Sequence, residues 1–125
     1  MPPSLSTAIL LVDDDPSVRR SLGRLLRATG YDVLDADTMA QALAILTTAR
    51  PALMLVDMVM PGSSTLDAVR QIKADPNTAT LPIIALTASP PSAPQDRALF
   101  ADIVAKPTDA GALLEVIART LAARS

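Results

Sequence analysis

The 125-residue chain contains no cysteine, no histidine and no tryptophan, and its only aromatic residues are Tyr31 and Phe100. The absence of cysteine excludes disulfides, thiolate metal sites and cysteine nucleophiles, and it fits a reducing cytoplasm. Because histidine is absent as well, zinc sites and histidine general bases are nearly excluded. Any bound metal would therefore have oxygen ligands, which suit Mg²⁺, Mn²⁺ or Ca²⁺.

The chain also lacks a surplus of basic residues and a long apolar segment. Its formal net charge of −2 creates no basic field for nucleic acid, and two aromatic residues offer little surface for stacking bases. No apolar run approaches the ~20 residues of a membrane span, and the N-terminus does not resemble a signal peptide. We therefore expect a cytoplasmic protein without direct nucleic-acid or membrane partners. The length predicts one domain over residues 1–125, with a core at about 8–122.

Five short apolar runs alternate with segments of helical periodicity. Asp15 and Thr38 are predicted N-caps, either Ser64 or Thr65 a third, and Thr108 a fourth; Gly30 is a helix stop. The alternation predicts an α/β fold with a doubly wound, flavodoxin-like parallel sheet in the order 2-1-3-4-5 and helices on both faces. The predicted strands are 8–12, 31–36, 53–56, 81–86 and 103–105, and the predicted helices are 16–29, 39–49, 65–75, 93–100 and 109–121.

Several chemically active side chains stand where the predicted strands end. Asp13 and Asp14 follow the first strand and Asp57 follows the third, which the expected order places side by side. Carboxylates gathered at one edge repel each other unless a cation neutralises them, and Mg²⁺ suits such ligands. Thr87 and Lys106 directly follow the fourth and fifth strands, where they could clamp a phosphoryl group. One carboxylate would then be free to act as a nucleophile.

Each of these residues also has a simpler interpretation. The run of aspartates before Pro16 could only complement a helix dipole, and Asp15 fits that role best. Lys106 alone could be a solvated surface charge, and Thr87 a strand-end hydroxyl. Their combination favours a functional site. The leucine-rich helix stripes, Met58 and Met60 are expected to be packing residues.

On these residues, the sequence resembles the receiver domain of two-component response regulators, as in the single-domain chemotaxis regulator. The acidic pair Asp13-Asp14, Asp57 inside VDMVMPG, Thr87-Ala88 and Lys106-Pro107 carry the resemblance, which covers residues 8–122. It implies a phospho-switch that takes a phosphoryl group from a sensor histidine kinase or a histidine phosphotransfer protein. It implies no enzyme beyond self-phosphorylation from a phosphodonor and slow loss of that phosphoryl group. An output protein or domain is implied but not identified, and a homodimer is compatible with the resemblance.

The resemblance also assigns roles to individual residues. Asp57 would be the phosphoacceptor. Asp14 and Asp57, with the backbone carbonyl of Val59, would bind Mg²⁺, and Asp13 would act directly or through water. Thr87, with the N–H of Ala88, and Lys106 would hold phosphoryl oxygens, and the Lys106-Pro107 peptide would be cis.

The chain departs from the family pattern in three places. Residues 63–65 read Ser-Ser-Thr where the family usually has Met-Asp-Gly. Ile103 occupies a position that usually carries an aromatic residue. The segment between Thr87 and Lys106 is about three residues short, at the proline-interrupted fourth helix. These departures predict conserved phosphoryl chemistry with an altered output.

Two other functions fit a doubly wound sheet with an aspartate at a strand end. A Mg²⁺-dependent phosphohydrolase would need a second aspartate two residues after its nucleophile, where this chain has Val59. A flavodoxin-like FMN binder would need a Ser/Thr/Gly-rich phosphate loop after the first strand, where this chain has three carboxylates.

Overall fold

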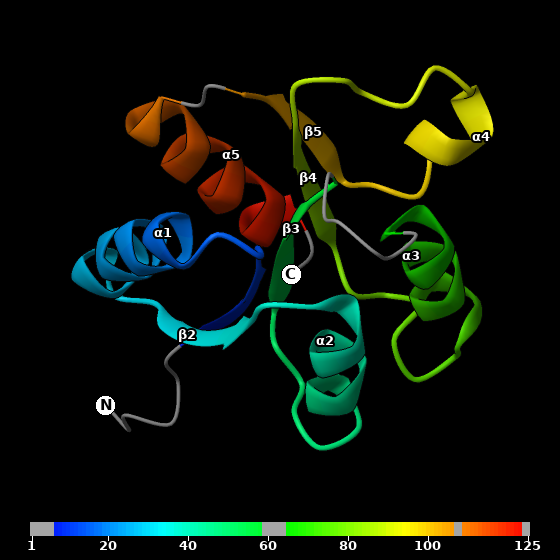
Figure 1. Cartoon of the computed structure of the whole chain (residues 1–125), viewed down its shortest axis with the longest axis horizontal. Coiled ribbons are helices and arrows are strands. Elements are labelled where there is room, and N and C mark those ends of the chain that lie inside the picture. The colour runs from blue at the N-terminus through cyan, green and yellow to red at the C-terminus, as the bar shows by residue number, and fades with distance from the viewer. Residues whose placement is uncertain (1–6, 59–64, 107–108, 124–125) are drawn as a thin grey trace.

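A computed structural model describes residues 7–58, 65–106 and 109–123 of the chain. Five strands alternate with five helices, and the strands form one parallel sheet in the order β2-β1-β3-β4-β5 (Figure 1). The predicted fold class and strand order are therefore confirmed. The elements are β1 (Ala8–Val12), α1 (Pro16–Thr29), β2 (Asp32–Ala36), α2 (Met39–Leu46), β3 (Leu53–Asp57), α3 (Thr65–Ala74), β4 (Ile83–Thr87), α4 (Pro94–Arg97), β5 (Asp102–Ala105) and α5 (Ala110–Ala123).

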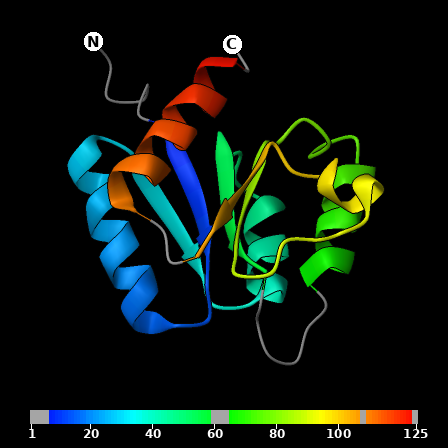
Figure 2. The same cartoon turned by 90° about the horizontal axis from the view of Figure 1, so that it is seen from above.

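The sheet is the middle of three layers. Helices α1 and α5 cover one face, and α2, α3 and α4 lie on the other (Figures 1 and 2). Along β1, Leu10 and Val12 join the core under α2 and α3, whereas Ile9 and Leu11 join the core under α1 and α5. This alternation follows from the two-residue repeat of a strand. Both faces are covered, so the central strands are apolar at nearly every position.

The N-caps fix where the first two helices begin. The Asp15 carboxylate accepts hydrogen bonds from the N–H groups of Ser17 and Val18, as predicted. Thr38 accepts one from Gln41 N–H at the start of α2. Gly30 ends α1 with a φ of 109°, a left-handed conformation that glycine adopts without a side-chain clash. The last residue of the acidic run, Asp15, is thus a helix cap.

The structure describes only part of the two other predicted cap regions, those before α3 and α5. Helix α3 begins at Thr65, and the alternative cap Ser64 lies outside the described residues. The predicted cap Thr108 of the last helix also lies outside them. Next to it, the Asp109 carboxylate accepts a hydrogen bond from Ala112 N–H. An aspartate that the sequence interpretation overlooked therefore contributes a capping contact to α5.

Helix α4 is shorter than the predicted helix 93–100. It spans only Pro94–Arg97, after which Leu99 and Phe100 donate backbone hydrogen bonds to carbonyls three residues earlier, as in a tight turn. This turn delivers Phe100 into the core and lets Ala101 N–H bond to Ile83 O on the sheet. Tertiary packing therefore ends the helix before its local sequence does.

Strands β3 and β4 each end one residue later than predicted, and β4 begins at Ile83 instead of at the predicted residue 81. Met58 N–H donates to Leu86 O, and Lys106 N–H donates to Thr87 O, both at 3.1 Å, so the hydrogen-bond ladder continues to the end of the strands. Asp57 and Thr87 are consequently the last residues of their strands. In the part of the chain that the structure describes, no helix has the length and apolar character of a membrane span.

Candidate functional site

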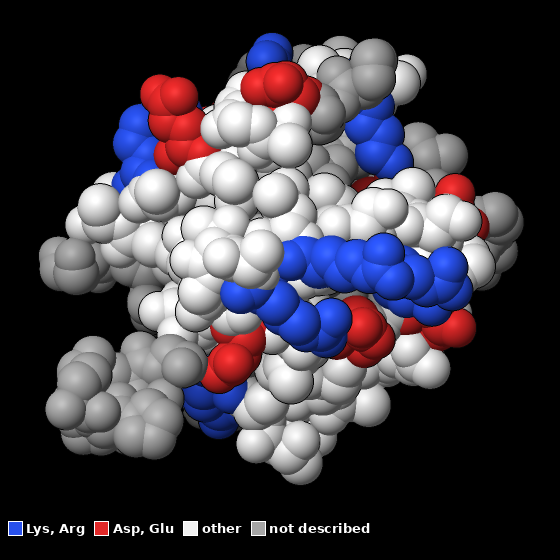
Figure 3. All heavy atoms as spheres, turned by 90° about the vertical axis from the view of Figure 1, so that its left-hand side faces the viewer, with Lys and Arg blue, Asp and Glu red and all other residues white. Residues whose placement is uncertain are grey.

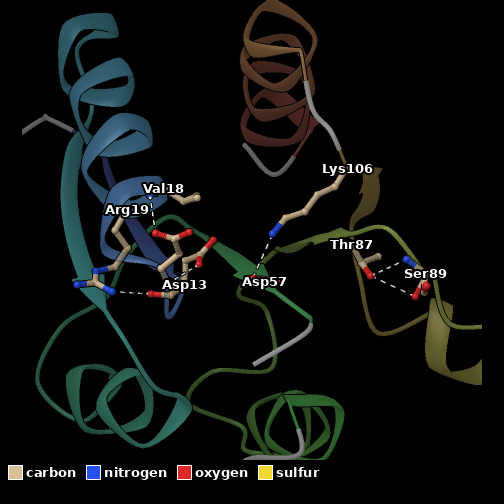
Figure 4. A network of polar contacts seen from close by, with 8 residues as sticks. Asp13, Val18, Arg19, Asp57, Thr87, Ser89 and Lys106 are labelled. Atoms are coloured by element: carbon tan, nitrogen blue, oxygen red, sulfur yellow. Dashed lines mark hydrogen bonds and ion pairs between the residues drawn. The ribbon is translucent and has the colours of Figure 1, made fainter. Parts of the chain in front are cut away.

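Asp57 lies at the carboxyl edge of the sheet, at the end of its central strand. Every residue of β3 is buried, and Asp57 itself is only 6% exposed. Its Oδ2 atom lies 3.1 Å from Nζ of Lys106, which follows β5 (Figure 4). A buried carboxylate next to an ammonium is thus offered at the edge where ligands of doubly wound sheets bind.

Asp13 and Asp14 complete an acidic cluster with Asp57. The three residues each offer a carboxylate oxygen, and these atoms lie within 4.8 Å of one another. Asp13 is buried and Asp14 is exposed. The structure therefore brings together the three carboxylates that the sequence placed at one edge, while Asp15 turns away to cap α1. Val59, predicted to offer its carbonyl to the same metal, lies outside the described residues.

The environment of Asp13 makes a lone negative charge costly. Its Oδ1 atom accepts a hydrogen bond from Asp15 N–H at 2.9 Å, but its buried Oδ2 atom has no hydrogen-bond partner in the described part of the chain. Burial raises the pKa of Asp13, and the charge of Asp57 raises it further, although the Asp15 N–H and Lys106 act in the opposite direction. An unpartnered buried oxygen within an all-oxygen donor set fits a Mg²⁺ ion.

Thr87 is fully buried beside Asp57, but its hydroxyl is engaged elsewhere. The Oγ1 atom accepts a hydrogen bond from Ser89 N–H at 3.0 Å and donates one to Ser89 O at 3.2 Å. Figure 4 shows the hydroxyl directed toward Ser89 rather than toward Asp57. To contact a group attached to Asp57, the Thr87 side chain would have to rotate and give up both bonds.

Ile103, at the usual aromatic position of the resembled family, lies in β5 and is half-buried. Its register partner is Ala85 of β4, and its side chain packs against the core under α2 and α3. A ring is absent at this position, so there is no aromatic side chain to change its exposure.

Arg19 is a residue of the site that the sequence interpretation overlooked. It belongs to the first turns of α1, and its Nη1 atom donates a hydrogen bond of 2.8 Å to the backbone carbonyl of Asp13. The sequence contains no simple signal for this contact, which joins residues six positions apart across a turn.

The fold and the acidic edge agree with a comparison against known families, in which the response regulator receiver domain matches residues 9–118. This chain belongs to that family. It is the receiver domain of a two-component response regulator. Receiver domains bind Mg²⁺ at an acidic pocket, and the cluster of Asp13, Asp14 and Asp57 is the matching feature here.

Receiver domains with similar sequences come from regulators of different sizes. The protein PilH of Pseudomonas aeruginosa is 32% identical over 117 residues, which cover 91% of this chain and 97% of PilH. The phosphate regulon regulator PhoB of the same species is 39% identical over 80 residues, which cover 64% of this chain and 35% of PhoB. The chain thus spans about a third of the length of PhoB, as it does of the DNA-binding regulator MtrA of Mycolicibacterium smegmatis.

Solved receiver structures superpose closely on this one. A response regulator receiver protein from Pseudomonas putida has a TM-score of 0.83 and 31% identity, covering 91% of this chain and 97% of its own. The chemotaxis regulator CheY4 of Vibrio cholerae has a TM-score of 0.83 and 27% identity, covering 92% and 98%.

Proposed function

We propose that this receiver domain is a phospho-switch in which Asp57 accepts a phosphoryl group from a phosphohistidine, with Mg²⁺ as cofactor. The donor would be a sensor histidine kinase or a histidine phosphotransfer protein, and the cytoplasm is the expected location. The observation that carries the proposal is the buried Asp57 carboxylate, flanked by an acidic pair on one side and by Lys106 on the other. Residues 1–125 would form one domain, with its core at about 8–122.

The residues of the site have distinct roles in this proposal. Asp57 attacks phosphorus, so an O–P bond forms while the N–P bond of the donor breaks, and the leaving imidazole keeps the electron pair. Asp13, Asp14 and Asp57, with the Val59 carbonyl, would hold Mg²⁺, which supplies positive charge to the transferred group.

The ammonium group of Lys106 and the hydroxyl group of Thr87 would stabilise the phosphorylated state. Lys106 would exchange its ion pair with Asp57 for one with a phosphoryl oxygen, because the Asp57 carboxylate loses its negative charge when it is phosphorylated. Thr87 would rotate away from Ser89 and donate its hydroxyl to another phosphoryl oxygen. The switch is therefore a change in the contacts of Lys106 and Thr87.

The surface around the site supports a protein donor. An apolar groove of about 630 Å³ opens beside Lys106 and is lined by Val18 and Leu22 of α1 and by Leu113 of α5. Helix α1 carries four arginines and no acidic residue, and Figure 3 shows a basic band across this side of the molecule. Of the four arginines of α1, Arg20, Arg24 and Arg27 are exposed. We expect the donor to present apolar side chains to the groove and carboxylates to the band.

The test is phosphorylation of the purified domain by a small acyl phosphate, followed by intact-mass measurement. One phosphoryl group should be incorporated in the presence of Mg²⁺ and none after chelation of the metal. Asp57→Asn should abolish incorporation, whereas Asp35→Asn, which changes an exposed aspartate of β2, should not. Undiminished incorporation in Asp57→Asn, or incorporation without Mg²⁺, would overturn the proposal.

A further inference from the structure

A basic side chain, that of Arg19, contacts the main chain of the turn that carries the acidic cluster. Arg19 extends from α1 to the far side of the turn that carries Asp13, where its Nη1 atom donates to the Asp13 carbonyl at 2.8 Å (Figure 4). Arg19 is half-buried, and it makes no salt bridge with a carboxylate in the described residues. Within the described residues, the one hydrogen bond of its side chain is therefore with the main chain of the acidic turn.

That contact completes the fixation of Asp13. The Asp13 N–H donates to Ala36 O at 3.1 Å, the Asp13 Oδ1 atom accepts from Asp15 N–H at 2.9 Å, and the Asp13 carbonyl accepts from Arg19. Backbone and carboxylate are each restrained, and only the buried Oδ2 atom is left without a hydrogen bond. The direction of Oδ2 is thus determined by the orientation of the backbone around it.

The peptide group between Asp13 and Asp14 joins the two carboxylates of the turn. If its carbonyl lost the guanidinium, the peptide plane could rotate, and both side chains would change direction relative to Asp57. Repulsion among the three carboxylates favours such a rotation in the absence of a cation. A hydrogen bond from a charged donor is strong enough to oppose it.

We propose that Arg19 is a positioning residue for the cation site: it fixes the Asp13-Asp14 peptide so that both carboxylates face the ion they share with Asp57. The inference rests on the proposed function, because that function includes the ion. It concerns a residue outside the set that contacts the ion or the phosphoryl group.

Charge and geometry predict opposite effects for Arg19. A positive charge near the cluster repels Mg²⁺, so removing the charge of Arg19 would by itself strengthen metal binding. Loss of the positioning contact would weaken metal binding, because partners that orient metal ligands typically contribute 10- to 100-fold to affinity. The sign of the change in Mg²⁺ affinity therefore separates the two effects, and a purely structural role would leave the affinity of the folded domain unchanged.

The decisive variant is Arg19→Met, with Mg²⁺ affinity measured by titration of the folded domain and detected by amide chemical shifts. We expect binding about tenfold weaker than in the original chain. Arg50→Met is the matched control, because Arg50 also donates to a main-chain carbonyl, that of Leu46 at 3.0 Å, on a different helix. It should bind Mg²⁺ as the original chain does. Equal or tighter binding in Arg19→Met would overturn the inference.

A second measurement needs no metal. Hydrogen exchange of the Asp15 amide, which donates to Asp13 Oδ1, should be several-fold faster in Arg19→Met than in the original chain or in Arg50→Met. Arg19→Lys keeps the positive charge and a hydrogen-bond donor, so its Mg²⁺ affinity and its Asp15 exchange rate should lie between those of Arg19→Met and the original chain. This variant replaces Arg19→Met in both measurements if Arg19→Met does not fold. If the original chain binds no Mg²⁺, the proposed function fails, whereas an unchanged Asp15 amide in the variants overturns the role of Arg19.

Discussion

Individual side chains at the acidic edge carry more negative charge than the described residues neutralise. Lys106 pairs with Asp57, but the buried Oδ2 atom of Asp13 has no hydrogen bond in that part of the chain. Burying a carboxylate without a partner costs free energy, which a bound cation offsets. The free energy of unfolding of the domain should therefore be lower without Mg²⁺ than with it.

This reasoning gives a prediction for Asp13→Asn. The amide keeps an acceptor for Asp15 N–H but removes the buried charge, so without metal the free energy of unfolding should rise by roughly 1–2 kcal/mol. The stabilisation that the original chain gains from added Mg²⁺ should be largely lost. Urea denaturation with Mg²⁺ and with a chelator measures both quantities. A less stable Asp13→Asn protein in the chelator would contradict the prediction.

The two neighbouring aspartates should separate metal binding from helix capping. Asp14 is exposed, so Asp14→Ala should change the metal-free stability little but weaken the response to Mg²⁺. Asp15→Ala should lose about 1 kcal/mol of stability, because the cap of α1 is removed, and keep the response to Mg²⁺. Equal losses of Mg²⁺ affinity in the two variants would show that the division of roles is wrong.

The sequence predicted residue positions better than side-chain directions. Asp13, Asp14, Asp57 and Lys106 could be brought together because the carboxyl ends of parallel strands share one edge. The turn of Thr87 toward Ser89 could not be predicted, since a strand-end hydroxyl has several rotamers and the adjacent backbone decides among them. The contact of Arg19 likewise depends on a long side chain meeting one particular carbonyl.

Among the connections between elements, the one from α3 to β4 is held by the half-buried ammonium group of Lys73. Lys73 Nζ donates to Leu81 O at 2.6 Å and to Ala79 O at 3.2 Å, which ties the end of α3 to the segment entering the sheet. Burial lowers the pKa of Lys73 from its ordinary value of 10.5. The folded chain consequently releases this proton at a lower pH than the unfolded chain does.

Replacing Lys73 should therefore have a pH-dependent effect. Lys73→Met removes two charge-assisted hydrogen bonds and should cost about 1 kcal/mol at pH 7. Between the lowered pKa and 10.5 the unfolded chain holds more protons than the folded one, so the contribution of Lys73 to stability rises with pH in that window. The stability difference between the original chain and Lys73→Met should thus widen in alkaline urea titrations. A difference that stays constant from pH 7 to pH 10 would contradict this prediction.

Helix α1 was predicted closely because its signals are local, whereas the end of α4 depends on long-range contacts. Helix α1 has its cap, its first-position proline and its terminal glycine in the sequence. Helix α4 has only its proline start, and its end is set by where Phe100 and the sheet require the chain. The same short helix is tied to α3 by the ion pair of Asp96 with Arg70, at 2.7 Å. Neither contact is visible in local periodicity.

In the molecule as a whole, one segment connects the acidic edge with the face covered by α3. The loop 89–94 begins at Ser89, whose N–H and carbonyl both bond to the Thr87 hydroxyl, and it ends at α4, where Asp96 is paired with Arg70. A rotation of Thr87 toward a phosphoryl group would release the first of these attachments. Ile103, in contrast, is packed in the core without a polar side-chain group to exchange.

We therefore expect phosphorylation to be reported mainly by Thr87, loop 89–94 and residues 63–65, with Ile103 and α5 changing little. A ligand shifts a two-state equilibrium only by its differential contacts, and Thr87 exchanges hydrogen bonds whereas Ile103 does not. Hydrogen exchange and amide chemical shifts, with and without Mg²⁺ and beryllofluoride, measure the response. Thr87→Val, which cannot donate to the phosphoryl mimic, should suppress the change in loop 89–94 while Lys106 still binds the mimic. If the largest changes in exchange or chemical shift centre on Ile103 and α5 while loop 89–94 and residues 63–65 do not change, this prediction is wrong.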